Sequence, residues 1–284
     1  MTEVLRYSAF TLGGEGGNPA GVVLDADGLD ETEMLRIAAE VGYSETAFLR
    51  PRPDEPNVYD VRYFAPEREV PFCGHATIAA AVALAEREPA AEMIFHTPAG
   101  LVTLNTHESS AGVVAELTSV APRVMQPPEG LVDACLKALH WAPEDLDPSY
   151  PPMLANAGAE HLVLVVRTRE RLSDLHYDFD ALAAIMAEHD LVTLQLVWPK
   201  SRRKYFARNP FPGGGVVEDP ATGAAAAAFG GYLRELGKIG HTASFTIRQG
   251  AEIGRPSQIE VSVIEGEPGV RLRGLASQIE EDDG

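Results

Sequence analysis

The sequence predicts an α+β protein with two related lobes, each a β-sheet wrapped around a central helix. Its 284 residues are enough for two domains. Short strand-like segments alternate with about two helices in each half. The segment RYFAPEREVPFCGHATIAAAVALAE, starting at Arg62, is echoed by KYFARNPFPGGGVVEDPATGAAAAAFGGYLRE, starting at Lys204. Both copies run from a Tyr-Phe-Ala strand end through a loop and a polar pair to a threonine and an alanine-rich helix, which indicates an internal duplication.

The first half is expected to begin with two strands joined by a loop and followed by a helix. The loop GGEGGNP, residues 13–19, is best interpreted as a tight turn, with a substrate-facing loop as the alternative. Asp30 and Glu33 have the spacing of a capping box at a helix start, and Gly42 is expected to end that helix. Glu45 then stands at the entrance of a short apolar strand. Strands are expected at Tyr7–Phe10, Ala20–Leu24, Val58–Phe64, Met93–Phe95, Leu101–Leu104 and Val113–Leu117.

The stretch from Ala121 to Gly130 is rich in proline and glycine and is the best candidate for a lobe boundary. We therefore expect an N-terminal lobe over residues 1–125 and a C-terminal lobe over residues 126–284, with a final strand able to cross back to the first lobe. The acidic ending from Gln278 is expected to be a solvated, frayed end. In the second half, helices are expected near Leu131–Leu139, Asp178–Glu188 and Ala221–Leu236, and strands at His161–Val166, Leu191–Trp198, Lys204–Ala207, Ser244–Arg248, Ile259–Ile264 and Val270–Arg273.

Composition excludes several classes of function. The net charge of −19 argues against nucleic-acid binding and against an anionic membrane surface, although a small anionic substrate is still allowed by local helix N-termini. No apolar run is long enough to span a membrane, and the N-terminus does not have the pattern of a secretory signal. Two cysteines are too few for a disulfide framework, so a cytoplasmic location is expected.

The polar pairs of the two copies are the candidate chemistry. His75, at the start of a helix, is expected to be neutral and able to exchange protons, and a thiolate at Cys73 would be favoured there. Asp219 precedes a proline, so it is either a functional carboxylate or a plain helix N-cap. The corresponding structural alternative for the first copy is a small core cysteine and a capping histidine. Because related lobes would place equivalent helix starts across a shared cleft, the duplication favours the functional interpretation.

The sequence has no persuasive metal-ligand spacing, no nucleophile elbow and no nucleotide-binding signature. Neither a metal nor a cofactor is therefore expected. Glu45, at an apolar strand entrance, has the setting of a general acid or base, but its residue type and position alone would not select it.

Five motifs together resemble the PhzF-like family, named for the isomerase of phenazine biosynthesis, which shares the fold of diaminopimelate epimerase. They occur in family order and span nearly the whole chain, and they are GNPAGVV (Gly17 to Val23), SETAF (Ser44 to Phe48), RYFAPEREVPFCGHAT (Arg62 to Thr77), EDPATGAA (Glu218 to Ala225) and RQGAEIGRPS (Arg248 to Ser257).

The resemblance implies a cofactor-free site in a cleft between two pseudo-symmetric lobes, in a protein that forms a homodimer. It implies that Glu45 moves a proton and that His75 and Asp219 assist. The family commonly has serine where this chain has Ala224, which puts the phenazine precursor itself in question as the substrate. Residues expected to contact the substrate are Asn18, Cys73, Gly74, Ala76, Thr222, Gly223 and Ala224.

The leading hypothesis is a cofactor-independent isomerase that shifts a proton on a small carboxylate-bearing metabolite. Backbone N–H groups at the two helix starts would hold the carboxylate. One alternative is an epimerase or racemase of an amino or hydroxy acid, with Cys73 as a second base. The other is a metabolite-binding protein that kept the fold without catalysis.

Overall fold

The computed structural model describes residues 2–88 and 92–280, so residues 281–284 of the acidic ending lie outside the described residues. The chain divides into two compact units: Met1–Thr118 with Arg273–Gly284, and Ser119–Leu272. The boundary between the units lies after Thr118, whereas the sequence predicted it after residue 125. It lies earlier because strand β9 (Arg123–Met125) pairs with a strand of the second unit. No helix within the described ranges is long and apolar enough to cross a membrane.

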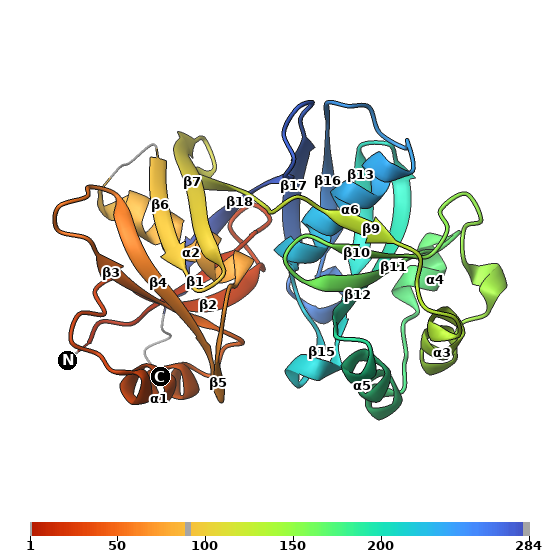
Figure 1. The fold of residues 1–284 in the computed structure, drawn as a ribbon, viewed down its shortest axis with the longest axis horizontal. Coiled ribbons are helices and arrows are strands. Elements are labelled where there is room, and N and C mark those ends of the chain that lie inside the picture. Colours follow the sequence, from red (N-terminus) through yellow and green to blue (C-terminus); the bar gives the residue numbers. More distant parts are fainter. Residues whose placement is uncertain (1, 89–91, 281–284) are drawn as a thin grey trace. The chain divides into compact units, whose positions relative to one another are not determined.

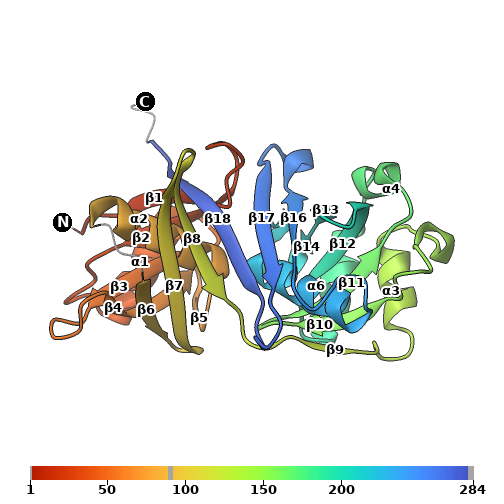
Figure 2. The same cartoon turned by 90° about the horizontal axis from the view of Figure 1, so that it is seen from above.

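The first unit is a closed sheet around one helix. Its strands follow the order β1-β2-β3-β4-β6-β7-β8-β18, and β1 also pairs with β18, which closes the ring. Figure 2 shows β18 returning beside β8. The bounds are β1 Leu5–Ala9, β2 Asn18–Val23, β3 Thr46–Pro51, β4 Val58–Ala65, β5 Arg68–Val70, β6 Glu92–Thr97, β7 Gly100–Ser109, β8 Gly112–Thr118 and β18 Arg271–Gln278.

Helix α2 (Gly74–Arg87) lies inside this ring and contacts β1, β2, β3, β7 and β8 (Figure 1). Ten of its fourteen residues are buried, mostly alanine, and small side chains let strands approach on every side. A helix that is apolar around its whole circumference belongs in a core, as the alanine-rich run predicted.

Helix α1 (Glu31–Val41) covers the outside of β3 and β4. Its start is confirmed: Asp30 accepts a hydrogen bond from the Glu33 backbone N–H, Glu33 accepts one from Asp30, and Gly42 closes the helix in the left-handed conformation. The glycine-rich loop before β2 is the expected tight turn, in which Leu12 and Glu15 form an isolated bridge.

The second unit has a sheet in the order β17-β16-β13-β12-β11-β10-β9. Its bounds are β9 Arg123–Met125, β10 Met153–Asn156, β11 Glu160–Val165, β12 Leu191–Ser201, β13 Lys204–Arg208, β16 Ala243–Gln249 and β17 Ser257–Val263, with a small separate sheet of β14 Pro210–Phe211 and β15 Val216–Glu218. Short 3₁₀ turns cover Pro143–Asp145, Pro212–Gly214 and Ala251–Ile253.

Helix α6 (Gly223–Glu235) is the central helix of this unit and contacts β9, β10, β11, β12 and β17. Helices α3 (Leu131–Ala138) and α5 (Phe179–Glu188) pack on the other face of the sheet, where Leu162, Leu194 and Leu196 join their apolar side chains (Figure 1). A short helix, α4 (Arg169–Ser173), also contacts β12. The predicted α+β class is thus confirmed, with one alanine-rich helix inside each unit.

Candidate functional site

The first unit gathers four of the predicted site residues at one edge of its sheet. Asn18 is the first residue of β2, and Glu45 directly precedes β3. Because β2 and β3 are parallel, they begin at the same edge, and the Gly21 backbone N–H donates to the Glu45 carbonyl at 3.1 Å. Cys73 and His75 reach this edge from the start of α2.

His75 is the centre of this cluster. Its Nδ1 lies 3.2 Å from Asn18 Nδ2 and 3.4 Å from Cys73 Sγ. Its Nε2 lies 3.4 Å from Ser44 Oγ and 3.4 Å from Glu45 Oε2. Because the Asn18 amide and the Cys73 thiol can both donate, these contacts suit a tautomer that accepts at Nδ1 and has Nε2 facing Ser44 and Glu45.

The Glu45 side chain is partly exposed to solvent, whereas the side chain of its partner His75 is buried. The Glu45 side chain is 16% exposed and that of His75 is 8% exposed. Its atom Oε2 is buried and accepts no hydrogen bond from any residue that the structure describes. A buried acceptor without a donor is costly in a folded protein, so this oxygen requires an explanation beyond core packing.

A chain of hydrogen bonds through Tyr63 and Thr77 holds the start of α2 in place. Thr77 Oγ1 donates to the Cys73 carbonyl at 2.7 Å and lies 2.6 Å from the Tyr63 hydroxyl. Burial raises the pKa of Tyr63, so this phenol stays protonated. The threonine of the GHAT motif is therefore a positioning residue beneath the cluster.

The second unit holds its own polar cluster around Thr222. Thr222 Oγ1 donates to Asp219 Oδ2 at 2.6 Å, and Gln249 Nε2 donates to the Asp219 carbonyl at 2.7 Å and to Thr222 Oγ1 at 3.0 Å. All three residues are buried. Gln249 is the last residue of β16, so its hydrogen bonds tie the loop before α6 to the end of this strand.

The alternative of Asp219 as a helix cap is wrong, and so is the expected helix start at Ala221. Helix α6 begins at Gly223 with Thr222 as its N-cap, because Gln249 holds the preceding segment in an extended conformation. Glu218, the neighbour of Asp219, forms a buried ion pair with Arg208, with Nε 2.9 Å from Oε2. Glu218 therefore anchors the loop through Arg208, while Asp219 accepts a hydrogen bond from Thr222 with one carboxylate oxygen.

The starts of the two central helices share a feature. Neither N-cap, Cys73 or Thr222, makes a side-chain capping bond, whereas Asp30 of α1 and Asp178 of α5 do. The first turns contain Gly74, Ala76, Gly223 and Ala224, which have no side chain large enough to cover them. First-turn N–H groups of this kind bind anions.

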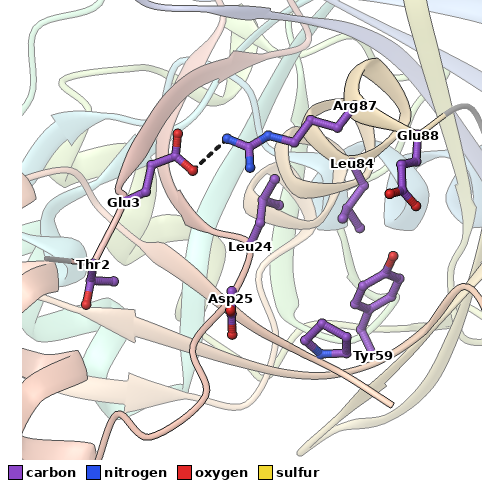
Figure 3. Close-up of a pocket in the computed structure, with 9 residues that line it drawn as sticks. Thr2, Glu3, Leu24, Asp25, Tyr59, Leu84, Arg87 and Glu88 are labelled. Atoms are coloured by element: carbon purple, nitrogen blue, oxygen red, sulfur yellow. Dashed lines mark hydrogen bonds and ion pairs between the residues drawn. The ribbon is translucent and has the colours of Figure 1, made fainter. Parts of the chain in front are cut away.

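A cavity of about 800 Å³ in the first unit lies away from these residues. Figure 3 shows Leu84, Arg87 and Glu88 lining it from the end of α2, opposite to the end that carries His75. An ion pair of 2.7 Å between Arg87 and Glu3 crosses its wall. This cavity is not the candidate site.

Sequence reasoning missed two residues of these clusters, Ser44 and Gln249. Both lie inside quoted motifs, SETAF and RQGAEIGRPS, but nothing local marks a serine or a glutamine as a partner of a distant histidine or threonine. The structure also brings Glu45, Cys73 and His75 together, with one donor atom of each within 4.8 Å of the others. No short sequence motif could have predicted this group, because Glu45 is far from Cys73 and His75 in the sequence.

Comparison with known proteins gives one consistent result. A family model described as phenazine biosynthesis-like protein matches residues 7–282. An uncharacterized isomerase, YfhB of Bacillus subtilis, is 31% identical over 96% of this chain and 95% of its own. The trans-2,3-dihydro-3-hydroxyanthranilate isomerase of Pseudomonas chlororaphis is 34% identical over 90% of this chain and 88% of its own. The crystal structure of a Bacillus anthracis phenazine biosynthesis protein of the PhzF family superposes with a TM-score of 0.87 at 26% identity, covering 98% of this chain and 97% of that one.

Proposed function

Because the chain belongs to the phenazine biosynthesis-like family of isomerases, we propose that it shifts a proton on a small carboxylate-bearing metabolite without a cofactor, with Glu45 as the general acid and base. His75 and Asp219 would assist, by polarising the substrate or relaying the proton.

The observation that carries the proposal is the state of Glu45. One oxygen is buried without a hydrogen-bond donor, and the side chain is still partly open to a ligand. A carboxylate that is held in place but not satisfied can accept a proton from carbon and release it again. His75 Nε2 lies 3.4 Å from Glu45 Oε2, near enough for the two groups to exchange a proton during turnover.

The distance between Glu45 and Cys73 favours a one-base shift over inversion by these two residues. Two bases on opposite faces of a carbon each need to approach it to about 3 Å, so they must stand roughly 6 Å apart. The donor atoms of Glu45 and Cys73 lie within 4.8 Å of each other. There is no room between them for a stereocentre, so the epimerase alternative with Cys73 as the second base is disfavoured.

The substrate class follows from the helix starts and from the relatives. Uncapped first turns at α2 and α6 suit a carboxylate, and a relative 34% identical isomerises trans-2,3-dihydro-3-hydroxyanthranilate, which carries one. Ala224 lacks the hydroxyl that the family commonly has at this position. We therefore propose a substrate of this class that does not require a hydroxyl contact there.

The test is deuterium uptake. The protein is incubated in deuterated water with a panel of small amino- and hydroxy-carboxylates, including the dihydro-hydroxyanthranilate, and uptake is read by mass spectrometry. Glu45→Gln should lower the rate of uptake by at least about a hundredfold. Glu40→Gln, which removes an exposed carboxylate of α1 paired only with Arg36, should leave it unchanged. Equal uptake by wild type and Glu45→Gln would refute the role of Glu45.

We also propose a homodimer, as the resemblance implies. Sedimentation equilibrium across a range of protein concentrations measures the mass in solution. A mass of about 30.5 kDa at every concentration would contradict a dimer.

A further inference from the structure

Gln249 makes three hydrogen bonds at the start of α6, and two of them fix the direction of its amide group. Its Nε2 donates to the Asp219 carbonyl at 2.7 Å, and its Oε1 accepts from the Thr222 backbone N–H at 3.3 Å. A carbonyl only accepts and a backbone N–H only donates, so exchanging the two ends of the amide would break both contacts. The amide nitrogen, which lies 3.0 Å from Thr222 Oγ1, is therefore a donor to this hydroxyl.

This donor determines the direction of the Thr222 hydroxyl proton. Because the hydroxyl oxygen accepts from Gln249, its own proton is left to donate, and Asp219 Oδ2 lies 2.6 Å away. Thr222 is the N-cap residue of α6, and an N-cap threonine ordinarily turns its oxygen toward the first helical turn. Thr222 makes no such capping bond, so its hydroxyl serves the Asp219 carboxylate instead.

The backbone of Asp219 is held on both sides. Its N–H donates to the Asn209 carbonyl at 2.9 Å, and its own carbonyl accepts from Gln249. Asn209 is itself buried, and its Nδ2 donates to Thr193 Oγ1 at 3.0 Å. Asp219 therefore has little freedom to move as a whole, and its carboxylate stays within reach of the Thr222 hydroxyl.

From these contacts we infer that Gln249 is a positioning residue, which directs the Thr222 hydroxyl at Asp219 and so holds Asp219 as an ionised carboxylate. A hydrogen bond to the charged form of a carboxyl group favours ionisation, and the positive end of the α6 dipole acts in the same direction. In the reaction, Asp219 would then be an acceptor rather than an acid. That role rests on the function proposed above, whereas the ionised state of Asp219 does not.

The test follows the titration of the Asp219 carboxyl group by NMR and needs no substrate. The chain is labelled with carboxyl-¹³C aspartate, and the signal that disappears in Asp219→Asn is assigned to Asp219. Thr222→Val, which removes the hydroxyl, should raise the pH of half-titration by about one to two units, the equivalent of one hydrogen bond to a charged group. Thr222→Ser, which keeps the hydroxyl, should titrate as the wild type does. The other charged or titratable groups on the segments around Asp219 are retained in every variant, namely Tyr177, Arg208, Glu218, Arg248 and Arg255.

Gln249→Met, with Gln249→Leu as a second apolar variant, tests the positioning step itself. Each removes the donor to Thr222 and keeps the hydroxyl and the carboxylate, so the half-titration pH of Asp219 should rise here too. Gln258→Met is the matched control, because Gln258 pairs with Arg248 and its side chain lies on the other face of the sheet from Gln249. A wild-type titration in Thr222→Val would overturn the bond to an ionised Asp219, and a wild-type titration in the Gln249 variants would overturn the role of Gln249.

Deuterium uptake separates this inference from the proposed function. With an exchanging substrate in hand, uptake by Thr222→Val and Gln249→Met should fall off at a higher pH than uptake by wild type and Thr222→Ser. If these two variants matched the wild type at every pH, the reaction would not need an ionised Asp219, and its part in catalysis would be refuted. Equal uptake by wild type and Glu45→Gln would instead refute the proposed function, and the titrations would still decide the role of Gln249.

Discussion

Breaking the buried ion pair between Arg208 and Glu218 from one side should destabilise the second unit strongly. The Arg208 and Glu218 side chains are 8% and 4% exposed, so solvent does not screen their charges. We consider Glu218→Gln, which keeps the shape of the side chain and removes the charge. It puts an NH₂ group against a guanidinium that only donates, so one of two hydrogen bonds is lost and the other weakens.

Its magnitude follows from the contacts that remain. Each hydrogen bond to a charged group contributes about 1.5–3 kcal/mol, and removing one partner of a buried ion pair costs about 3–5 kcal/mol because the other charge is stranded. Arg208 keeps the Ser173 carbonyl at 2.8 Å, which holds the cost toward the lower part of this range. For a unit of roughly 150 residues, 3–4 kcal/mol lowers the melting temperature by about 6–16 °C.

The assay is calorimetry and chemical denaturation of four proteins: wild type, Glu218→Gln, Arg208→Met, and the double variant that combines Arg208→Met with Glu218→Gln. Both single variants should lose several kcal/mol. Removing both charges together should cost much less than the sum of the single losses, since no charge is left buried. The Ser173 and Leu172 carbonyls lose a donor in the double variant.

Two results would refute this reasoning. Glu218→Gln with less than about 1 kcal/mol of destabilisation would mean that the pair behaves like an exposed salt bridge. A double variant as unstable as the sum of the two single variants would mean that the groups do not interact, and that each has a separate structural role.

Two further predictions concern buried positions. Burial lowers the pKa of His161 to about 4, below its value near 6.5 in the unfolded chain. Between these two pH values the unfolded state binds one more proton than the folded state. The free energy of unfolding should therefore fall by roughly 3 kcal/mol as the pH drops from about 6.5 to 4. Denaturation of wild type and His161→Gln across this range measures the difference, and parallel pH profiles would contradict it. A Cβ on Gly21 would meet Thr46 Oγ1 at 2.5 Å, so Gly21→Ala should cost about 1–3 kcal/mol, and adding Thr46→Ala should recover part of it. Melting temperatures of wild type and these two variants test this, and a Gly21→Ala protein as stable as wild type would refute it.

Local signals were enough to predict the first helix and both central helices. The capping roles of Asp30, Glu33 and Gly42 could be predicted from the sequence, because capping depends on residues within one turn of each other. The alanine-rich runs predicted two central helices, because few other residues allow strands to pack against a helix on all sides. The short strands β5, β9, β10, β14 and β15 were not predicted; Arg123–Met125, for example, lies among prolines, and β10 has only four residues.

The errors near Asp219 have a tertiary cause. An aspartate followed by proline matches a helix start, but the helix begins only at Gly223 because Gln249, 27 residues beyond Thr222, bonds the segment between. A residue so far along the chain cannot enter a local rule. The same holds for Glu45, because its proposed role rests on the resemblance and its own neighbours would not have selected it.

The uncapped starts of α2 and α6 are a second feature that bears on the proposed substrate. A missing N-cap costs about 1 kcal/mol per helix, and the chain does cap α1 and α5 with aspartate. Cys73 and Thr222 occupy the cap positions of the two central helices without making the bond. Helix α3 also starts without a side-chain cap, so the missing caps of α2 and α6 support the proposed carboxylate substrate only together with the polar side chains that surround these two helix starts.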